Sequence, residues 1–319
     1  MGANVAIALM KVLGWLLTGA ASMLAEAIHS VADSANQILM LVGGKAAKKK
    51  ATAEHPFGFG RDRYLSGFLV AMILFSMGGL FALYESYTKF QEVRAGHPNS
   101  LLESRWWWVA IVVLVGSMAA ESFSLHTAVT ESRPHKGKGR WFRFIRRSKA
   151  PELPVVLLED TAALTGLTFA LLGVVLTLVT GSGYFDVIGS GLIGLLLIVV
   201  AIILAIETQS LLIGEAAAPE AIARITEAIA GTDGVEGIVH MKTVHLGPEE
   251  ILVAAKIAVP PGSSGVDVAN LIDRVERRIR SAEPLVGPVY LEPGLVDPSL
   301  LEQGLKDADP LTTGVAAPE

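Results

Sequence analysis

The chain has 319 residues and a formal net charge of −5; 51% of its residues are hydrophobic and only 18% are charged. This composition is too apolar for an ordinary soluble domain and predicts an integral membrane protein. The chain contains no cysteine, which excludes disulfides and thiolate ligands, so any bound metal must be held by nitrogen and oxygen donors.

Six apolar stretches are long enough to cross a hydrocarbon core, which takes about 20 residues per helix. They cover residues 3–22, 23–42, 64–83, 106–129, 153–179 and 187–207, and they predict a six-helix transmembrane domain over residues 1–208. Only a short Gly-Ala-Ala-Ser segment separates the first two stretches, which predicts a tight hairpin. Lys11 lies in the middle of the first stretch, which indicates a membrane span and not a cleaved signal peptide.

The second stretch contains the segment LAEAIHSVADSANQ, which places His29 and Asp33 one helical turn apart on the same helix face. Two ionisable groups in an apolar helix are costly to bury unless they face a partner, water or a cation. We therefore interpret the pair as a candidate cation site. The alternative is that the two side chains simply pair with each other.

Basic residues concentrate in two connections, and short loops rich in Lys and Arg lie on the cytoplasmic side of a membrane. The loop after the second stretch carries Lys45, Lys48, Lys49, Lys50, Arg61 and Arg63, and the loop after the fourth carries Arg133, Lys136, Lys138, Arg140, Arg143, Arg146, Arg147 and Lys149. With six spans, both termini are then cytoplasmic as well. The aromatic residues Trp141, Phe142 and Phe144 within the second loop indicate contact with anionic lipid rather than nucleic acid.

Three tryptophans, Trp106–Trp108, begin the fourth stretch at its outer edge. Indole rings favour the headgroup region of a bilayer, so these residues are expected to anchor the helix at the interface.

The composition becomes that of a soluble domain after Glu207. Helical periodicity over 219–230 and 266–282, with strand patterns over 237–245, 251–259 and 289–291, predicts a small α+β layer with both helices on one face. This domain is expected to span residues 209–293. Residues 294–319 are rich in Pro, Gly, Asp and Ala without periodicity, which predicts a disordered tail.

The segment LAEAIHSVADSANQ, followed by HPFGFGRDRYLSGFLVAMILFSMGGLFALYES, resembles the cation diffusion facilitator family of divalent-metal transporters. LLEDTAALTG in the fifth stretch is most similar to the branch that contains the mitochondrial zinc transporter 9. The resemblance implies an α-helical membrane protein with a cytoplasmic ferredoxin-like domain. It further implies a homodimer that exports Zn²⁺ from the cytoplasm in exchange for protons.

In that family the transport site takes two ligands from the second helix and two from the fifth. The resemblance assigns His29 and Asp33 to the first pair and Asp160 to the second, but Val156 stands where the family has a histidine. Zinc accepts a carboxylate in place of an imidazole. The candidate replacements are, in order, Glu159, Glu121 and Glu26, each of which could instead only hydrogen-bond to a helix neighbour.

An oxygen-rich site would soften zinc selectivity and admit Mn²⁺, Fe²⁺ or Co²⁺. Metal and protons compete for His29 and the carboxylates, because only the deprotonated groups bind metal, and this competition predicts antiport. A proton-coupled antiporter of this kind alternates its site between the two membrane faces. The expected location is a bacterial plasma membrane.

Further cytoplasmic metal sites of the family are not expected here. Phe59 stands where a second histidine commonly accompanies His55, which is therefore interpreted as a loop hydrogen-bonder. In the C-terminal domain His240 and His245 lie near the first strand. Residues other than the usual ligands stand at the remaining positions, namely Ala255, Tyr290 and Glu292. We expect the dimer to rest on packing.

Two other classes of function stay open from the sequence. A membrane-embedded metallohydrolase would need a base-bearing motif such as HExxH, which the sequence lacks. A membrane scaffold that has lost transport could keep the fold with a degenerate metal site.

Overall fold

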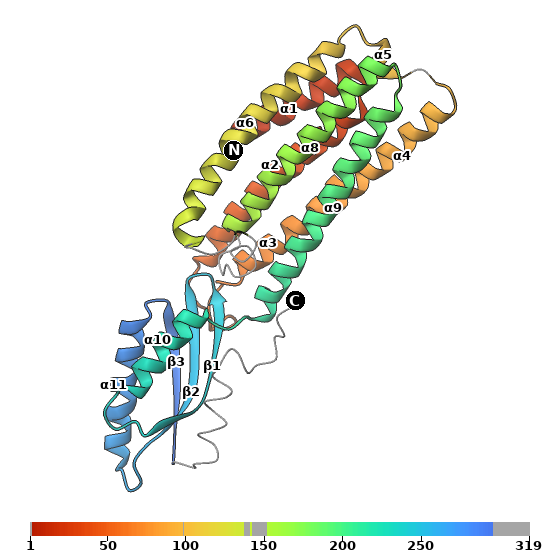
Figure 1. The fold of residues 1–319 in the computed structure, drawn as a ribbon. Helices are drawn as coiled ribbons and strands as arrows, with labels where there is room; N and C mark the ends of the chain where they lie inside the picture. Colours follow the sequence, from red (N-terminus) through yellow and green to blue (C-terminus); the bar gives the residue numbers. More distant parts are fainter. Residues whose placement is uncertain (1, 98, 137–140, 142–151, 296–319) are drawn as a thin grey trace, which may run out of the picture. The chain divides into compact units, whose positions relative to one another are not determined.

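The computed structural model describes residues 2–97, 99–136, 141 and 152–295 (Figure 1). The chain divides into two compact units. The first comprises Met1–Lys48 and Asp62–Gln209, and the second comprises Lys49–Arg61 and Ser210–Glu319. Most of the basic loop at 137–151 and the tail from 296 lie outside the described residues, so the expectations for them stay predictions.

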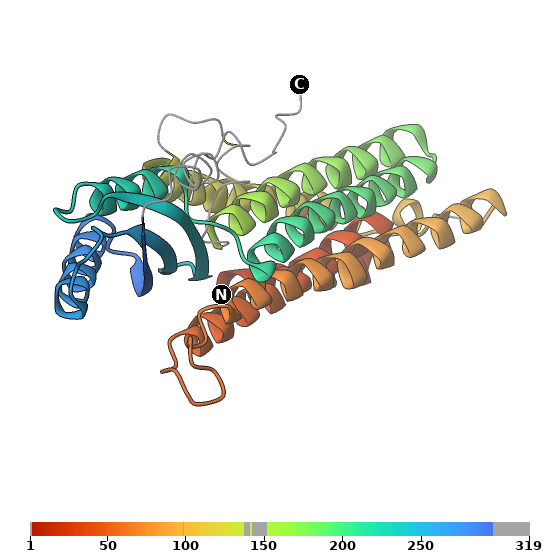
Figure 2. The same cartoon turned by 90° about the horizontal axis from the view of Figure 1, so that it is seen from below.

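The first unit is built from long helices that run side by side (Figures 1 and 2). They are α1 (Gly2–Thr18), α2 (Ala21–Ala47), α3 (Asp62–Ile73), the π-helical segment η1 (Leu74–Leu80), α4 (Phe81–Arg94), the short α5 (Ser100–Glu103), α6 (Trp107–Lys136), α8 (Glu152–Thr180) and α9 (Tyr184–Ile213). The rod formed by α3, η1 and α4 is one of four helices in the described part that are long and apolar enough to cross a membrane, with α6, α8 and α9.

The helices of the first unit pack around α2. This helix contacts α1, α8 and the α3–η1–α4 rod, and α6 packs against α1 and α8. The core contains Met23, Leu114, Leu167 and Leu197, all of which are almost fully buried. Large apolar side chains such as Phe123, which is 75% exposed, cover the outside. An apolar outer surface is what a lipid-facing helix bundle requires.

The hairpin between α1 and α2 lies within the Gly-Ala-Ala-Ser segment where the sequence predicted it, although α1 ends at Thr18 and the predicted span ran to Ser22. Gly19 adopts a left-handed conformation with φ of +66°, and Ala21 already begins α2. The carboxylate of Asp186, from the first turn of α9, accepts hydrogen bonds from the backbone N–H groups of Ala21 (2.7 Å) and Ser22 (3.2 Å). A carboxylate at a helix N-terminus satisfies orphan donors and complements the helix dipole.

Asp186→Ala is expected to destabilise the first unit by about 1–3 kcal/mol, because it leaves two backbone donors at the start of α2 unpaired in a buried place. The measurement is the melting temperature of the purified protein in detergent. Glu103→Ala removes an exposed carboxylate on α5 and serves as the control, with little change expected. Equal melting temperatures for Asp186→Ala and wild type would contradict the capping role.

The second unit is a three-stranded sheet with both helices on one face (Figure 1). Its elements are α10 (Pro219–Ala230), β1 (Gly237–Gly247), β2 (Glu250–Ala258), α11 (Gly265–Ala282) and β3 (Val286–Gly294). The strand order is β1-β2-β3, with β1 antiparallel and β3 parallel to β2. Ile225, Val253 and Val275 meet at the centre of the core between helices and sheet.

The third strand is longer than the predicted span of 289–291. It pairs with β2 from Val286, opposite Ile251, to Gly294, opposite Ala258. The prolines and glycines around the short apolar run suggested loops, but an edge strand tolerates proline where its N–H is not needed. β3 is such an edge strand.

A capping box begins α11. The Ser264 hydroxyl accepts a hydrogen bond from the Asp267 backbone N–H and the Asp267 carboxylate accepts one from the Ser264 backbone, at 3.2 Å each. The Ser264 side chain also donates to Asp267 and lowers the pKa of that carboxyl. A lowered pKa means that Asp267 supports the helix above the pKa it has in the unfolded chain, and that this support is lost as the pH falls through the folded-state pKa.

Candidate metal centre

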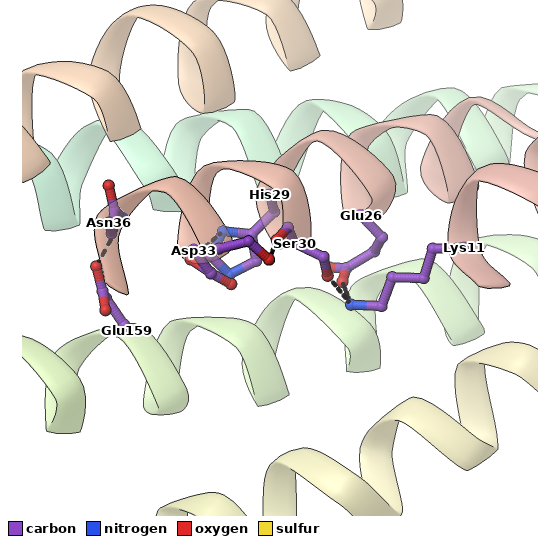
Figure 3. A network of polar contacts seen from close by, with 8 residues as sticks. Lys11, Glu26, His29, Ser30, Asp33, Asn36 and Glu159 are labelled. Carbon is purple, nitrogen blue, oxygen red and sulfur yellow. Dashed lines mark hydrogen bonds and ion pairs between the residues drawn. The ribbon is translucent and has the colours of Figure 1, made fainter. Parts of the chain in front are cut away.

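A stripe of polar side chains runs along one side of α2 inside the first unit (Figure 3). Glu26, His29, Ser30 and Asn36 are buried, and Asp33 is 16% exposed. Their spacing of three and four residues keeps them on one helix face. The local sequence explains the helix, because small and apolar residues such as Ala25, Ala27 and Ala32 occupy the other positions and are buried against neighbouring helices.

His29 and Asp33 face each other at the centre of this stripe. The distance from His29 Nδ1 to Asp33 Oδ1 is 3.5 Å, which is an ion-pair distance and too long for a good hydrogen bond. Neither ring nitrogen of His29 nor Oδ1 of Asp33 has a hydrogen-bond partner within the described part of the chain. Buried polar atoms without partners are costly, so this pair is suited to a ligand that completes it.

Lys11 from α1 reaches the same stripe one turn before His29. Its Nζ donates to Glu26 Oε2 at 3.0 Å and to Ser30 Oγ at 2.7 Å, and both Lys11 and Glu26 are 0% exposed. The third-ranked candidate ligand, Glu26, is therefore held by an ammonium group (Figure 3).

The two adjacent acidic residues in α8, Glu159 and Asp160, contact different helices. Glu159 Oε1 accepts a hydrogen bond of 2.8 Å from Asn36 Nδ2 on α2, whereas Asp160 Oδ2 accepts one of 2.9 Å from Ser124 Oγ on α6. Adjacent residues on a helix point about 100° apart, which explains the different partners. Glu159 thus lies on the side of α8 that faces the polar stripe of α2.

Glu121 lies on α6, one turn before Ser124, and is half-buried. It lies close enough to Asp33 and Asp160 to interact with both electrostatically. Across the described ranges, no three His, Asp or Glu side chains come together in a group that could hold a metal ion. The structure brings together His29 with Asp33, and places Glu159, Asp160 and Glu121 on the helices that flank or neighbour them.

Sequence reasoning missed three polar partners of this centre. Lys11, Asn36 and Ser124 hold Glu26, Glu159 and Asp160, respectively. A lysine in the middle of an apolar helix was a usable signal for the first of them, because an intramembrane charge needs a partner. The spacing of Asn36, three residues after Asp33 on the same helix face, was a usable signal for the second. No sequence pattern around Ser124 distinguishes it.

The histidines of the second unit do not form a metal-binding cluster with other acidic or histidine side chains within its described part. The His55 ring stacks on Phe59 with 4.6 Å between ring centroids. The His245 Nδ1 lies 3.1 Å from the Gly247 carbonyl oxygen, and the His245 side chain is buried. Glu292 accepts a hydrogen bond of 2.7 Å from Lys256, which lowers the pKa of the Glu292 carboxyl.

Comparison with known families identifies both parts of the chain. The model of the cation efflux transmembrane domain matches residues 1–213, and the model of the cytoplasmic domain of cation efflux proteins matches residues 217–287. The chain belongs to the cation efflux family. This confirms the resemblance that the helix motifs indicated, and it makes the chain a multi-pass integral membrane protein with a cytoplasmic domain of the family's dimer type.

Several curated proteins are similar to this cation efflux chain. The mouse protein named proton-coupled zinc antiporter SLC30A9, mitochondrial, is 34% identical over 249 residues, which are 77% of this chain and 42% of that protein. Metal tolerance protein C4 of Arabidopsis thaliana is 29% identical over 76% of this chain and 52% of its own length. The chain therefore spans about half the length, or less, of these relatives, and the mouse protein is named as an antiporter and not as an enzyme.

A more distant relative is magnetosome protein MamM of Paramagnetospirillum magneticum, at 23% identity over 42% of this chain and 41% of that protein. A solved structure of a MamM C-terminal domain is 21% identical and covers 24% of this chain and 92% of that domain, with a TM-score of 0.23.

Proposed function

We propose that this protein is a secondary transporter that exports divalent metal ions, with Zn²⁺ as the main substrate, from the cytoplasm in exchange for protons. One observation carries the proposal. His29 and Asp33 form a buried pair with unpaired donor atoms on a membrane helix, opposite the carboxylate-bearing face of α8. In a chain of the cation efflux family, that pair is the natural place for a cation to bind within the membrane.

The proposed ligand set is His29 and Asp33 from α2 with Asp160 and Glu159 from α8, and Glu121 as a further acid from α6. Zinc favours four nitrogen and oxygen donors, and one imidazole with carboxylates provides them. The hydrogen bond from Asn36 supports Glu159 as a metal ligand, because it holds the Glu159 carboxylate against α2. In this proposal the metal replaces Asn36 as the partner of Glu159.

Proton exchange follows from the ligand chemistry. His29 and the carboxylates bind a metal ion only after they lose their protons, so metal loading on one side releases protons there. Protons that arrive from the opposite side then displace the ion, and the site is exposed alternately to each face. The SLC30A9 relatives are named proton-coupled zinc antiporters, which supports the proposed exchange of metal for protons.

The proposed architecture has six membrane spans over residues 1–208, with α1 and α2 as spans in addition to the four helices that are both long and apolar enough to cross a membrane. Residues 209–293 form a cytoplasmic ferredoxin-like domain that dimerises with a second copy, and both termini lie in the cytoplasm. The basic residues after α2 and α6 support this orientation. The proposed location is the plasma membrane of a bacterium.

The test is metal uptake by liposomes that contain the purified full chain, a zinc indicator inside and an imposed pH gradient. Zinc uptake that needs the gradient, together with proton movement in the opposite direction, is the expected result. Uptake of Mn²⁺, Fe²⁺ or Co²⁺ in place of Zn²⁺ would keep the mechanism and change the substrate. Absence of flux with all four ions would refute the proposal and favour a scaffold.

A further inference from the structure

The ion pair between Lys11 and Glu26 is the one buried charge pair on the α2 stripe that the proposed ligand set does not use. Lys11 is fully enclosed, and its ammonium is bonded to the carboxylate of Glu26 and to the hydroxyl of Ser30. Two of the three ammonium protons are thereby satisfied. The pair has the geometry of a built arrangement, not of a chance contact between flexible surface side chains.

Stability alone does not account for this pair. Desolvating two charges costs several kcal/mol per ion, and replacing a buried pair by apolar residues is often neutral or stabilising. Within a membrane helix such residues are rare and mark functional sites. The presence of Lys11 therefore calls for a role that depends on its charge.

The position of the pair gives that charge an effect on the metal site. Ser30 is adjacent to His29, and Glu26 lies one helical turn before it on the same face. Lys11 and Glu26 are both close enough to His29 and Asp33 to act on them electrostatically. A positive charge at this position repels an incoming divalent cation, and a negative one attracts it.

Glu26 also has a free coordinating atom. Its Oε1 has no hydrogen-bond partner among the residues that the structure describes, and it faces α8 where Gly166 leaves room for it. A Cβ atom at position 166 would lie only 2.6 Å from Glu26 Oε1. Glu26 would therefore be an additional attractive carboxylate if Lys11 did not neutralise it.

We propose that Lys11 is a resident counter-cation of the transport site, which neutralises Glu26 and keeps the affinity of His29 and Asp33 for divalent metal low enough for release. This inference rests on the proposed transport function and adds a positioning residue from α1 to it. A transport site must bind its ion well enough to load and weakly enough to unload. Lys11 keeps the binding weak enough for the ion to unload.

The proposal predicts opposite effects for two single substitutions. Lys11→Met keeps most of the length of the side chain but removes the charge, so the apparent KM for zinc and the zinc Kd fall about tenfold and maximal transport slows. Glu26→Gln leaves the ammonium without its counter-charge, so both constants rise about tenfold. The double variant Lys11→Met with Glu26→Gln restores charge neutrality and returns both constants to within about threefold of wild type.

The measurements are zinc binding to the purified full chain by calorimetry and zinc uptake by liposomes, each on the wild type and the three variants. Ser34→Ala is the matched control on α2, because the Ser34 hydroxyl donates to the Ser30 carbonyl of its own helix, and it should leave both constants unchanged. Size-exclusion profiles identify any variant that fails to fold.

The direction of the shifts decides the inference. Opposite shifts that cancel in the double variant support it, and shifts in the same direction, or no shift in either single variant, overturn it in favour of a purely structural pair. If Lys11→Met does not fold, the same comparison is made between Glu26→Gln and the double variant. Opposite shifts in Kd without zinc flux in the wild type would refute transport but keep the electrostatic role, whereas a wild type that binds none of Zn²⁺, Mn²⁺, Fe²⁺ and Co²⁺ refutes both.

Discussion

Replacing Asp33 with asparagine is expected to lower zinc transport by at least about a hundredfold, since removing even an outer partner of a metal ligand costs 10–100-fold. Asparagine has nearly the same shape, so the packing of α2 is kept while the anionic donor is lost. The His29 ring, 3.5 Å away, then faces a neutral amide, and the site loses one of the charges that a divalent ion needs. Initial rates of zinc uptake by liposomes measure the effect.

The control for this prediction again uses α2. Ser34→Ala changes a neighbouring side chain whose hydroxyl donates to the backbone of its own helix, so transport should stay within about twofold of wild type, as surface-type substitutions usually change little. Equal rates for Asp33→Asn and Ser34→Ala would show that Asp33 is not a ligand. The remaining ion path would then have to be sought along α6 and α8.

The sequence predicted correctly those features that depend on a single helix or strand. The spacing of His29 and Asp33 correctly predicted a shared face, because side chains four residues apart meet on any α-helix. The four long apolar helices were also predictable from their hydropathy, and the C-terminal sheet with its two helices on one face from its periodicity. The capping of α2 was not, because it depends on Asp186, a residue of α9 that is distant in the sequence.

The candidate site shows the same limit at the level of side chains. Because Glu159 and Asp160 are adjacent on α8, the sequence predicts that their side chains point in different directions. It does not predict that Asn36 donates to Glu159 and Ser124 to Asp160. Those choices depend on how α2, α6 and α8 pack. The role of Lys11 depends equally on a neighbouring helix, since only the contact between α1 and α2 joins it to Glu26. Whether six helices span the membrane stays a prediction.

Glu159 is the proposed replacement for the missing histidine of the family pattern. Glu159→Gln removes the carboxylate charge that Asn36 holds against α2. The substitution is expected to lower zinc transport by about a hundredfold, as expected for the loss of the direct ligand Asp33. Asn36 donates to the amide oxygen of glutamine as it does to the carboxylate, so the helix contact should survive. A fall in zinc transport therefore reports the lost donor charge and not a loosened helix.

Val156→His in the same Glu159→Gln chain should restore zinc transport to within about tenfold of wild type, because positions 156 and 160 share a helix face and zinc accepts imidazole readily. Restored transport should also favour zinc over manganese, since imidazole suits zinc whereas carboxylates suit manganese. Val156→Ala in the Glu159→Gln chain changes the volume without adding a ligand, so it should not rescue. Rescue by alanine, or full activity of Glu159→Gln alone, would exclude Glu159 from the ligand set. Glu121 would then be the next candidate, because Glu121 lies close enough to Asp33 and Asp160 to interact with both electrostatically.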